Sequence, residues 1–525
     1  MSTGNDFPDE DLQQAEPVDN RAFLDLVSDS AGPLFSIARI VVATRGRSGE
    51  ICSRLLLGEL HTQAASAEEL LDSYGARRNG SWRRLRASVA GLKLFSEVAY
   101  ILFHIRLFMP RYHLLPVTPD FAEATQRATD FACRTITGYS ARLLEYARDL
   151  GLVELKTARS AEDFVERLPV GELPQDCGTE SVQSAEETVV YLATAFLNLA
   201  EDGHMLQARS DTRQLAANLI PDPINEEDIR RLEDAFHGLQ ARYDTYVADT
   251  NLESIDRDLP VLRGHITVIY HLLQTATALC HHYERHISLA RRVPGLVVNA
   301  VVDRDELLEF LVDYSIRYAD LYVRQTRELC QNMLRRYSVP GTVEVPVPRY
   351  RGFHVRPTTL IARIVRHYGA EVRMQIDGEE YDAAVPFDLF RANEKLNADK
   401  RRAIAADAIG ILHVEPALLD RSREELVRAV ARRLFEQRKL VLYDRTLSLE
   451  DVALRIDAPA EDCVVDALLK LFTLGKIDVE LPAFATFLGD RRVIADIKLL
   501  AEQNYGEDDF GNNLALPGEL SYLRR

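Results

Sequence analysis

The sequence lacks several signals that mark common classes of protein. Its six cysteines lie far apart and none forms a Cys-x-x-Cys pair, so neither a zinc ribbon nor a redox dithiol is indicated. No P-loop, no Gly-x-Ser-x-Gly motif and no glycine-rich dinucleotide fingerprint occurs in the 525 residues. Most of the chain therefore carries no enzyme or cofactor signal, and we expect buried free thiols in a reducing compartment.

Long hydrophobic runs are also missing. The most apolar stretch, Val98 to Met109, contains His104 and Arg106 and is too short to cross a bilayer, so we predict a buried helix and no membrane span. Residues 1–20 are acidic and polar, without a basic start or an apolar segment, which is typical of a disordered tail rather than a signal peptide. We therefore expect a cytoplasmic protein.

An excess of positive charge is absent as well. The formal charge of −18 disfavours binding to nucleic acid or anionic lipid, because both require a cationic surface. Residues 341–440 differ from the rest, with 18 Lys and Arg against 15 Asp and Glu. This slightly basic stretch is electrically unlike the acidic chain around it.

The first part of the chain has the pattern of an all-α region. From residue 21 to 337 apolar residues recur at helical spacing, and Asn225 and Asp303 are expected to cap helices reaching about Asp249 and Arg336. The loop-like composition of residues 156–186 could divide this region into 21–155 and 186–337. The sequence leaves open whether this region forms one domain or two.

After residue 340 the periodicity changes to that of an α/β domain, which we place at 341–440. Val343, Val345 and Val347 alternate with Glu344, Pro346 and Pro348, and the prolines predict a strand at a sheet edge. The further predictions, in order, are a helix at 355–368, a strand at 372–376, a hairpin turn at Asp377-Gly378, a strand at 379–383, a short helix at 386–392, a polar insertion at 393–406, a strand near 409–415 and a helix capped by Ser422 and Glu425. The order β-α-β-β-α-β-α predicts an open-faced sandwich with helices on one side of an antiparallel sheet.

The remaining residues, 441–525, are predicted to form a small, mainly helical domain that is weakly similar to a winged helix. Helices are expected near 449–456 and 461–474. The second of these carries Glu461, Asp462 and Asp466, which would repel phosphates. An interaction module is therefore favoured over DNA binding.

A short motif opens the helix of the α/β domain. Gly352-Phe353-His354-Val355-Arg356-Pro357 resembles the phosphorylation motif of the HPr phosphocarriers, usually Gly-Leu-His-Ala-Arg-Pro, and the predicted order of elements resembles that family over about 100 residues. The resemblance implies that His354 accepts a phosphoryl group through Nδ1 from an Enzyme I-type donor. An acceptor or effector protein would receive it or respond to it, so the chain would be a phosphoryl carrier without a cofactor rather than a turnover enzyme.

The residues of the motif suit this chemistry. A histidine at a helix start faces free N–H groups and the positive end of the helix dipole, and Arg356 can donate charge-assisted hydrogen bonds to phosphoryl oxygens. Gly352 permits the tight approach, and Pro357 needs no N–H in a first turn. No Asp or Glu occurs from Val345 to Ala370, whereas five arginines do: Arg349, Arg351, Arg356, Arg363 and Arg366. This basic stretch is expected to steer a phosphoanion to His354.

Two positions depart from the family pattern. Val355 replaces the usual small residue, and its β-branched side chain could hinder a partner. Val385 stands where the resemblance implies the regulatory serine of Gram-positive HPr proteins, so control by a serine kinase is not expected. The alternative is a docking scaffold that is never phosphorylated.

A metal site is the other alternative. His282 and His286 have the i, i+4 spacing that can share a metal, with His271 and His281 nearby, but Glu284 lies on another face and Arg285 disfavours a cation. We expect a solvated or hydrogen-bonded histidine face and no metal. The sequence does not indicate an oligomeric state.

Overall fold

The computed structural model describes residues 17–152, 160–167, 171, 173, 185–202, 220, 224–248, 250–288, 301–443, 447–479 and 483–524. Residues 1–16 of the expected tail and Cys177 lie outside these residues. Most of the expected dividing loop at 156–186 lies outside them as well. The chain forms two compact units. The helical unit comprises Met1–Thr188 and Leu199–Leu329, and the sheet unit comprises Val189–Asn198 and Cys330–Arg525.

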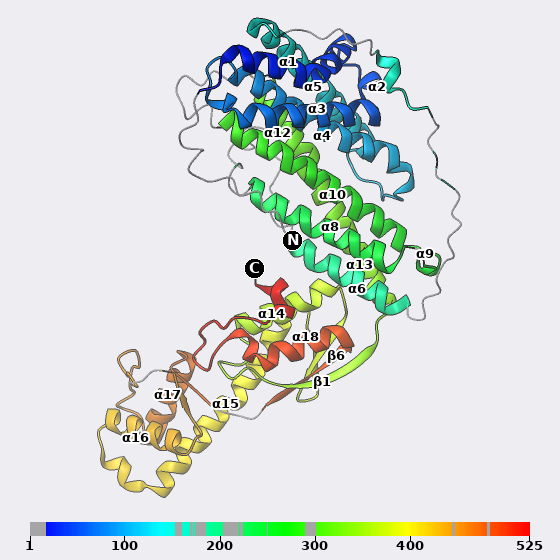
Figure 1. Cartoon of the computed structure of the whole chain (residues 1–525). Helices are drawn as coiled ribbons and strands as arrows, with labels where there is room; N and C mark the ends of the chain where they lie inside the picture. The colour runs from blue at the N-terminus through cyan, green and yellow to red at the C-terminus, as the bar shows by residue number, and fades with distance from the viewer. Residues whose placement is uncertain are drawn as a thin grey trace, which may run out of the picture. The chain divides into compact units, whose positions relative to one another are not determined.

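The helical unit contains α-helices, two π-helical segments and short 3-10 turns (blue to green in Figure 1). Its α-helices are α1 (Asn20–Ala43), α2 (Ser48–Ile51), α3 (Arg54–Ser73), α4 (Arg83–Phe108), α5 (Phe121–Leu150), α8 (Glu226–Tyr246), α9 (Leu252–Ile255), α10 (Leu259–His282) and α12 (Arg304–Glu309). The π-helical segments are η6 (Tyr283–Ser288) and η7 (Phe310–Ile316), and the 3-10 turns are η2 (Ala76–Arg78), η3 (Met109–Arg111) and η4 (Ala161–Phe164). Two helices, α6 (Ala185–Asp202) and α13 (Arg317–Arg336), contribute residues to both units.

Side-chain caps define the ends of these helices. Asn225 accepts from the Asp228 amide at the start of α8, and Asp303 accepts from the amides of Asp305 and Glu306 at the start of α12. These bonds satisfy donors that a helix cannot pair internally, at a typical gain of about 1 kcal/mol each. Both predicted caps are confirmed.

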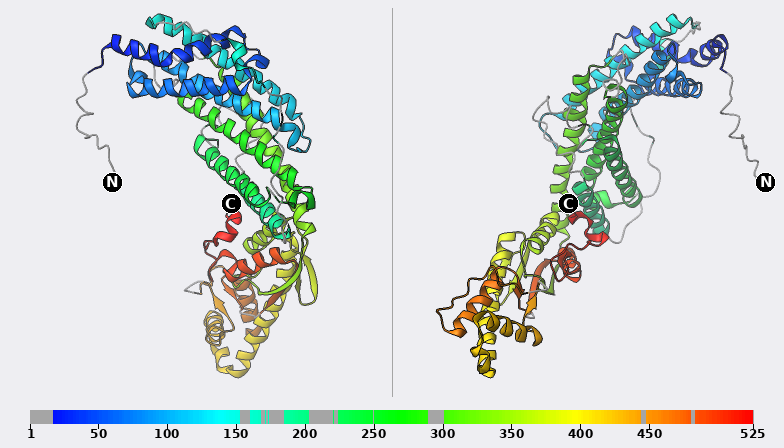
Figure 2. Two further views of the ribbon diagram at one scale, coloured as in Figure 1. Left: turned by 45° about the vertical axis from the view of Figure 1, so that its right-hand side comes forward. Right: turned by 90° about the vertical axis from the view of Figure 1, so that its left-hand side faces the viewer.

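The core of the helical unit is made by α1, α3, α4 and α5, which lie side by side in both views of Figure 2. Leu57, Leu92 and Leu143 on three of these helices are fully buried. Two stretches, Asn20–Ala43 and Arg83–Arg111, are long and apolar enough to cross a membrane by length and composition alone. In the most apolar 18 residues of each stretch, 61% and 67% are buried within the structure, as in the core helices of a bundle. Their length and composition are therefore only weak evidence for a membrane span.

The sheet unit alternates helices with short strands (light green to red in Figure 1). Its elements are β1 (Pro340–Pro346), α14 (Val355–Tyr368), β2 (Val372–Ile376), β3 (Glu379–Asp382), α15 (Pro386–Val414), η8 (Pro416–Asp420), α16 (Arg423–Glu436), β4 (Val441–Leu442), α17 (Ala460–Thr473), β5 (Ile477–Asp478), β6 (Phe484–Asp490), α18 (Arg491–Glu502), η9 (Asn504–Gly506) and η10 (Gly518–Leu523).

The main sheet is antiparallel with the strand order β1-β6-β2-β3. The edge position of β1 is confirmed, and it agrees with the prolines of this strand, which cannot donate to a ladder. The predicted helix at 355–368 and the predicted hairpin are also confirmed. Asp377 and Gly378 both have positive φ, as a two-residue hairpin turn requires.

The second half of the predicted α/β order was assigned to the wrong residues. The expected insertion at 393–406 and the expected strand near 409–415 both lie inside α15, one continuous helix of 29 residues. The fourth strand of the sheet is β6, and α18 packs on β1 and β6. The sheet therefore extends well beyond the expected boundary at residue 440.

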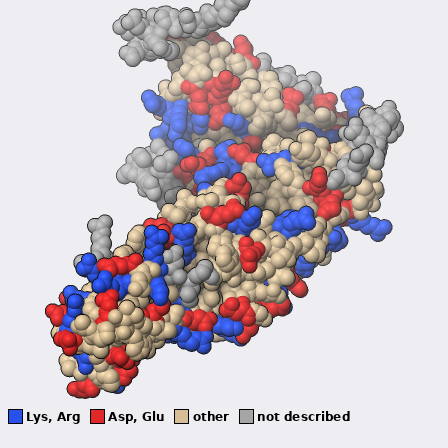
Figure 3. Space-filling model, turned by 90° about the horizontal axis from the view of Figure 1, so that it is seen from below, with Lys and Arg blue, Asp and Glu red and all other residues tan. Residues whose placement is uncertain are grey.

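Between α15 and β6, the chain forms a separate helical cluster. The capping box of Ser422 and Glu425 is confirmed, but α16 packs with α17 and the second half of α15 around a core that includes Leu426 and Leu468. The predicted helix near 461–474 corresponds to α17, whereas residues 449–456 do not form the expected helix, and β4 and β5 form a short antiparallel pair. Exposed charges of both signs intermix on the face shown in Figure 3.

Candidate functional site around His354

The loop that leads from β1 into α14 is held by an asparagine of α15. Arg351 and Gly352 both have positive φ, at 57° and 64°. The Asn393 side chain accepts from the Phe353 amide at 2.9 Å and donates to the Arg351 carbonyl at 3.2 Å. A Cβ atom on Gly352 would lie 2.2 Å from Asn393 Oδ1, so glycine is required for this close approach.

His354 occupies the N-cap position of α14. Its carbonyl accepts from the amide and the hydroxyl of Thr358, at 3.2 and 2.9 Å. The amides of Val355 and Arg356 have no acceptor among the described residues, and Pro357 has no N–H. The imidazole therefore lies beside two free donors at the positive end of a helix.

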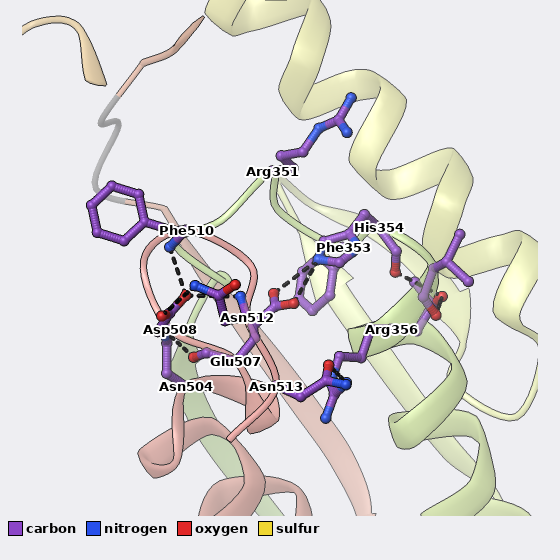
Figure 4. Close-up of polar contacts among 12 residues, drawn as sticks. Arg351, Phe353, His354, Arg356, Asn504, Glu507, Asp508, Phe510, Asn512 and Asn513 are labelled. Atoms are coloured by element: carbon purple, nitrogen blue, oxygen red, sulfur yellow. Dashed lines mark hydrogen bonds and ion pairs between the residues drawn. The ribbon is translucent and has the colours of Figure 1, made fainter. Parts of the chain in front are cut away.

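The imidazole is oriented by a carboxylate distant in sequence. His354 Nε2 lies 2.8 and 3.0 Å from the two carboxylate oxygens of Glu507 (Figure 4). The Glu507 side chain is 1% exposed and that of His354 is 23% exposed. An ionised carboxylate can only accept, so in this contact the proton lies on Nε2, and whenever the ring is neutral the lone pair lies on Nδ1. No described residue hydrogen-bonds Nδ1.

Glu507 lies in a tightly folded loop after α18. Asn504, Tyr505 and Gly506 all have positive φ, which costs free energy at the two non-glycine positions. Hydrogen bonds fix the conformation: the Tyr505 hydroxyl donates to the Pro346 carbonyl at 2.8 Å, and the Leu514 amide donates to the Gly506 carbonyl at 2.9 Å. The loop thus presents Glu507 to His354 at defined geometry.

Asp508 stabilises the tip of the same loop. Its carboxylate accepts from the amides of Phe510 and Asn512 and from the Asn512 side chain. These bonds hold the pKa of Asp508 below its usual range. The Asp508 carboxylate is therefore hydrogen-bonded within its own loop.

Arg356 contacts this loop as well. Its guanidinium donates to the side-chain oxygen of Asn513, and its Nε is buried without a hydrogen-bond partner among the described residues. An unpartnered buried N–H is costly, so Arg356 is held in this position at the expense of one hydrogen bond. His354 and Arg356, which the sequence predicts together, both face the loop at 507–513 (Figure 4).

The arginines of the predicted basic stretch have partners of several kinds in the structure. Arg349 pairs loosely with Asp509 at 3.6 Å, and Arg363 and Arg366 donate to the carbonyls of Leu523 and Ala384. The stretch without acids in the sequence therefore lies against an acidic loop. Residues far along the chain, Glu507 and Asp509, supply this acidic side of the site, and steering of a phosphoanion by the arginines stays a prediction.

The remaining predicted site residues have varied positions. Pro357 is buried in the first turn of α14, Val355 is 65% exposed, and Arg351 is exposed with its amide 3.4 Å from the Tyr443 hydroxyl. The sequence reasoning missed Asn393 and Glu507. The only available signal for Glu507 was the Gly-Glu-Asp-Asp-Phe-Gly run, which has the composition of a turn and no link to His354.

The histidines of α10 have separate partners. His281 lies 2.9 Å from Glu226, and the buried His282 lies 3.4 Å from the Tyr139 hydroxyl. The His286 side chain lies outside the described part of the chain. Within the described ranges no group of three or more His, Cys, Asp or Glu could hold a metal ion.

Comparison of the chain with family models, with curated proteins and with solved structures found no match.

Proposed function

We propose that this protein is an HPr-like phosphocarrier or regulator in which His354 accepts a phosphoryl group from an Enzyme I-type donor. The observation that carries the proposal is the contact of His354 Nε2 with Glu507, which in the neutral ring would put the proton on Nε2 and the lone pair on Nδ1. Nδ1 is the atom that the resemblance implies for attack.

The arrangement of elements supports the same proposal. The order β1, α14, β2, β3, α15, β6, α18 follows the β-α-β-β-α-β-α order of the family if the helical cluster between α15 and β6 is an insertion. The motif then lies between the first strand and the first helix, as the resemblance implies. An open-faced sandwich with this insertion is the fold that we propose for the sheet unit.

The proposed step is a displacement at phosphorus. The Nδ1 lone pair forms the new N–P bond as the bond between phosphorus and the donor breaks, and the donor keeps that electron pair. The ring, still protonated on Nε2, becomes cationic, and the Glu507 carboxylate stabilises this charge. Arg356 and the free amides of Val355 and Arg356 donate to the phosphoryl oxygens.

The test uses the full chain with phosphoenolpyruvate and the Enzyme I of the same organism. We expect acid-labile, base-stable phosphate on the protein, lost in His354→Ala and retained in His413→Ala. His413 is a suitable control because it is exposed on a helix of the same unit. If an Enzyme I that labels its own HPr leaves this chain unlabelled, the carrier proposal fails.

A docking protein without phosphoryl transfer is the second candidate. This candidate is favoured because the 507–513 loop contacts both His354 and Arg356. It is also favoured because Val355, next to His354, is exposed. A docking protein would bind its partner equally well before and after incubation of the chain with phosphoenolpyruvate and Enzyme I. Isothermal titration with that partner, once isolated, separates the two functions. For either function we propose the cytoplasm as the location, with no nucleic-acid partner.

A further inference from the structure

Two cysteines that are far apart in sequence meet inside the helical unit. Cys52 Sγ lies 3.4 Å from Cys133 Sγ, although 81 positions separate them. Both are free thiols. Cys280, by comparison, lies beside the Glu284 carboxylate. The expectation that no redox dithiol exists came from the sequence spacing alone, and spacing cannot detect such a pair.

The two thiols have different surroundings. Cys52 is partly exposed at the end of the four-residue helix α2, directly before the cap of α3. Cys133 is fully buried in α5, a helix of 30 residues. Cys52 is therefore the more accessible of the two cysteines.

Electrostatics reinforce this asymmetry. The hydrogen bond with Cys133 lowers the pKa of the Cys52 thiol, and the positive charge of Arg106 acts in the same direction, whereas burial and Asp130 oppose it. The same hydrogen bond, together with burial, raises the pKa of Cys133. Because the thiolate is the nucleophile, Cys52 is the attacking residue of the pair.

We propose that Cys52 and Cys133 form a peroxide-reactive pair that cycles between dithiol and disulfide. The Cys52 thiolate attacks a hydroperoxide oxygen, the O–O bond breaks, and the departing oxygen takes a proton and leaves as water or alcohol. Cys133 Sγ then attacks the sulfur of the Cys52 sulfenic acid, and the displaced hydroxide takes the Cys133 proton and leaves as water. The two thiols lose two electrons to the peroxide, and a cellular dithiol returns them by exchange.

The surrounding structure permits the bond. An S–S bond is about 2.04 Å long, so the sulfurs must approach by about 1.4 Å from their 3.4 Å separation. Cys52 can supply this movement because it lies in the short link between α2 and α3, whereas Cys133 is held within α5. The bridge would tie α2 to α5 and enclose α3 and α4 in one covalent loop.

The test treats the native full chain with one to a few equivalents of hydrogen peroxide, followed by alkylation, digestion and mass spectrometry. We expect a Cys52–Cys133 linked peptide, reversal by dithiothreitol, and a rise of roughly 5 °C in the melting temperature of the oxidised helical unit. Cys280→Ser should form the same bridge, because its thiol takes no part.

Two variants establish the order of the steps. Cys52→Ser should leave Cys133 reduced at the same peroxide dose, and Cys133→Ala should accumulate a dimedone-reactive sulfenic acid at Cys52. If Cys133→Ala fails to fold, Cys52→Ser alone decides, since this partly exposed position tolerates serine. The proposal is overturned if native protein shows no linked peptide, or if linkage appears only in urea.

Discussion

His265 in the helical unit and His354 in the sheet unit differ in how many of their ring nitrogens are used. His265 is fully buried; its Nε2 accepts from the Leu115 amide at 3.0 Å, and its Nδ1 lies 2.7 Å from the Thr326 hydroxyl. His354 uses only Nε2, with Glu507. Both nitrogens of His265 are therefore engaged inside its unit, whereas Nδ1 of His354 has no hydrogen-bond partner among the described residues. The following predictions test this contrast.

The largest effect is expected from Gly264→Ala, next to His265. An added Cβ would lie 1.8 Å from the Tyr112 carbonyl oxygen, and a backbone atom cannot move aside cheaply. We expect the free energy of unfolding of the helical unit to fall by about 3 kcal/mol or more. Urea denaturation followed by circular dichroism measures this.

The matched control is Gly238→Ala, a helical glycine on α8 whose added Cβ would meet nothing within 4 Å. It should stabilise the helix by up to about 1 kcal/mol. Equal losses in both variants would show that α10 is not held closely against the Tyr112 carbonyl.

A pH-dependent loss of stability is expected at His265. Burial lowers its pKa to about 4, from the usual 6.5, so the unfolded chain binds the proton more tightly. Stability is therefore complete above pH 6.5 and falls as the pH decreases toward 4, by roughly 3 kcal/mol.

The measurement is the urea midpoint between pH 7 and 4, in wild type and in His265→Gln. In the variant the urea midpoint should depend less steeply on pH. Part of the remaining dependence should come from His271, because burial also lowers its pKa to about 4. An unchanged slope would show that His265 is not a neutral, doubly bonded residue.

A smaller loss is expected from Asn393→Ala in the sheet unit. The substitution leaves the Phe353 amide and the Arg351 carbonyl without their partner. We expect a loss of about 2 kcal/mol from the free energy of unfolding, together with slower labelling of His354 as its loop loosens. Asn397→Ala, one turn further along α15 with a weak exposed bond to Glu394, should change neither.

The smallest effect, on rate rather than stability, is expected from Glu507→Gln. The amide can turn its NH₂ group toward Nε2, so the protonated-Nε2 tautomer loses its advantage and labelling by the phosphodonor slows by about tenfold. Nitrogen-15 NMR of the imidazole reports the tautomer directly. Asp509→Asn removes a charge from the same loop and should leave the tautomer as it is, because Asp509 pairs only loosely with Arg349. A tautomer that is insensitive to Glu507→Gln would rule out the orienting role of Glu507.

Local patterns accounted for much of the first half of the sheet unit. The helix at Val355–Tyr368, the turn at Asp377-Gly378 and the edge strand β1 depend on neighbouring residues, so their signals are contained in short windows. The expected strand near residues 409–415 was wrong because a short apolar run fits a buried strand and a helix equally well. Only the length of α15 distinguishes the two.

The sequence by itself determined the mostly helical character, the helix caps at Asn225 and Asp303, and the position of His354 at a helix start. Tertiary structure alone decided which residues meet there: Glu507 on its imidazole, Asn513 on Arg356, and Asn393 on its loop. It also decided that Cys52 and Cys133 are neighbours. The physical reason is the same in each case. Caps and turns depend on bonds between residues a few positions apart, whereas these contacts join residues 40 to 157 positions apart, and only the packing of whole elements brings them together.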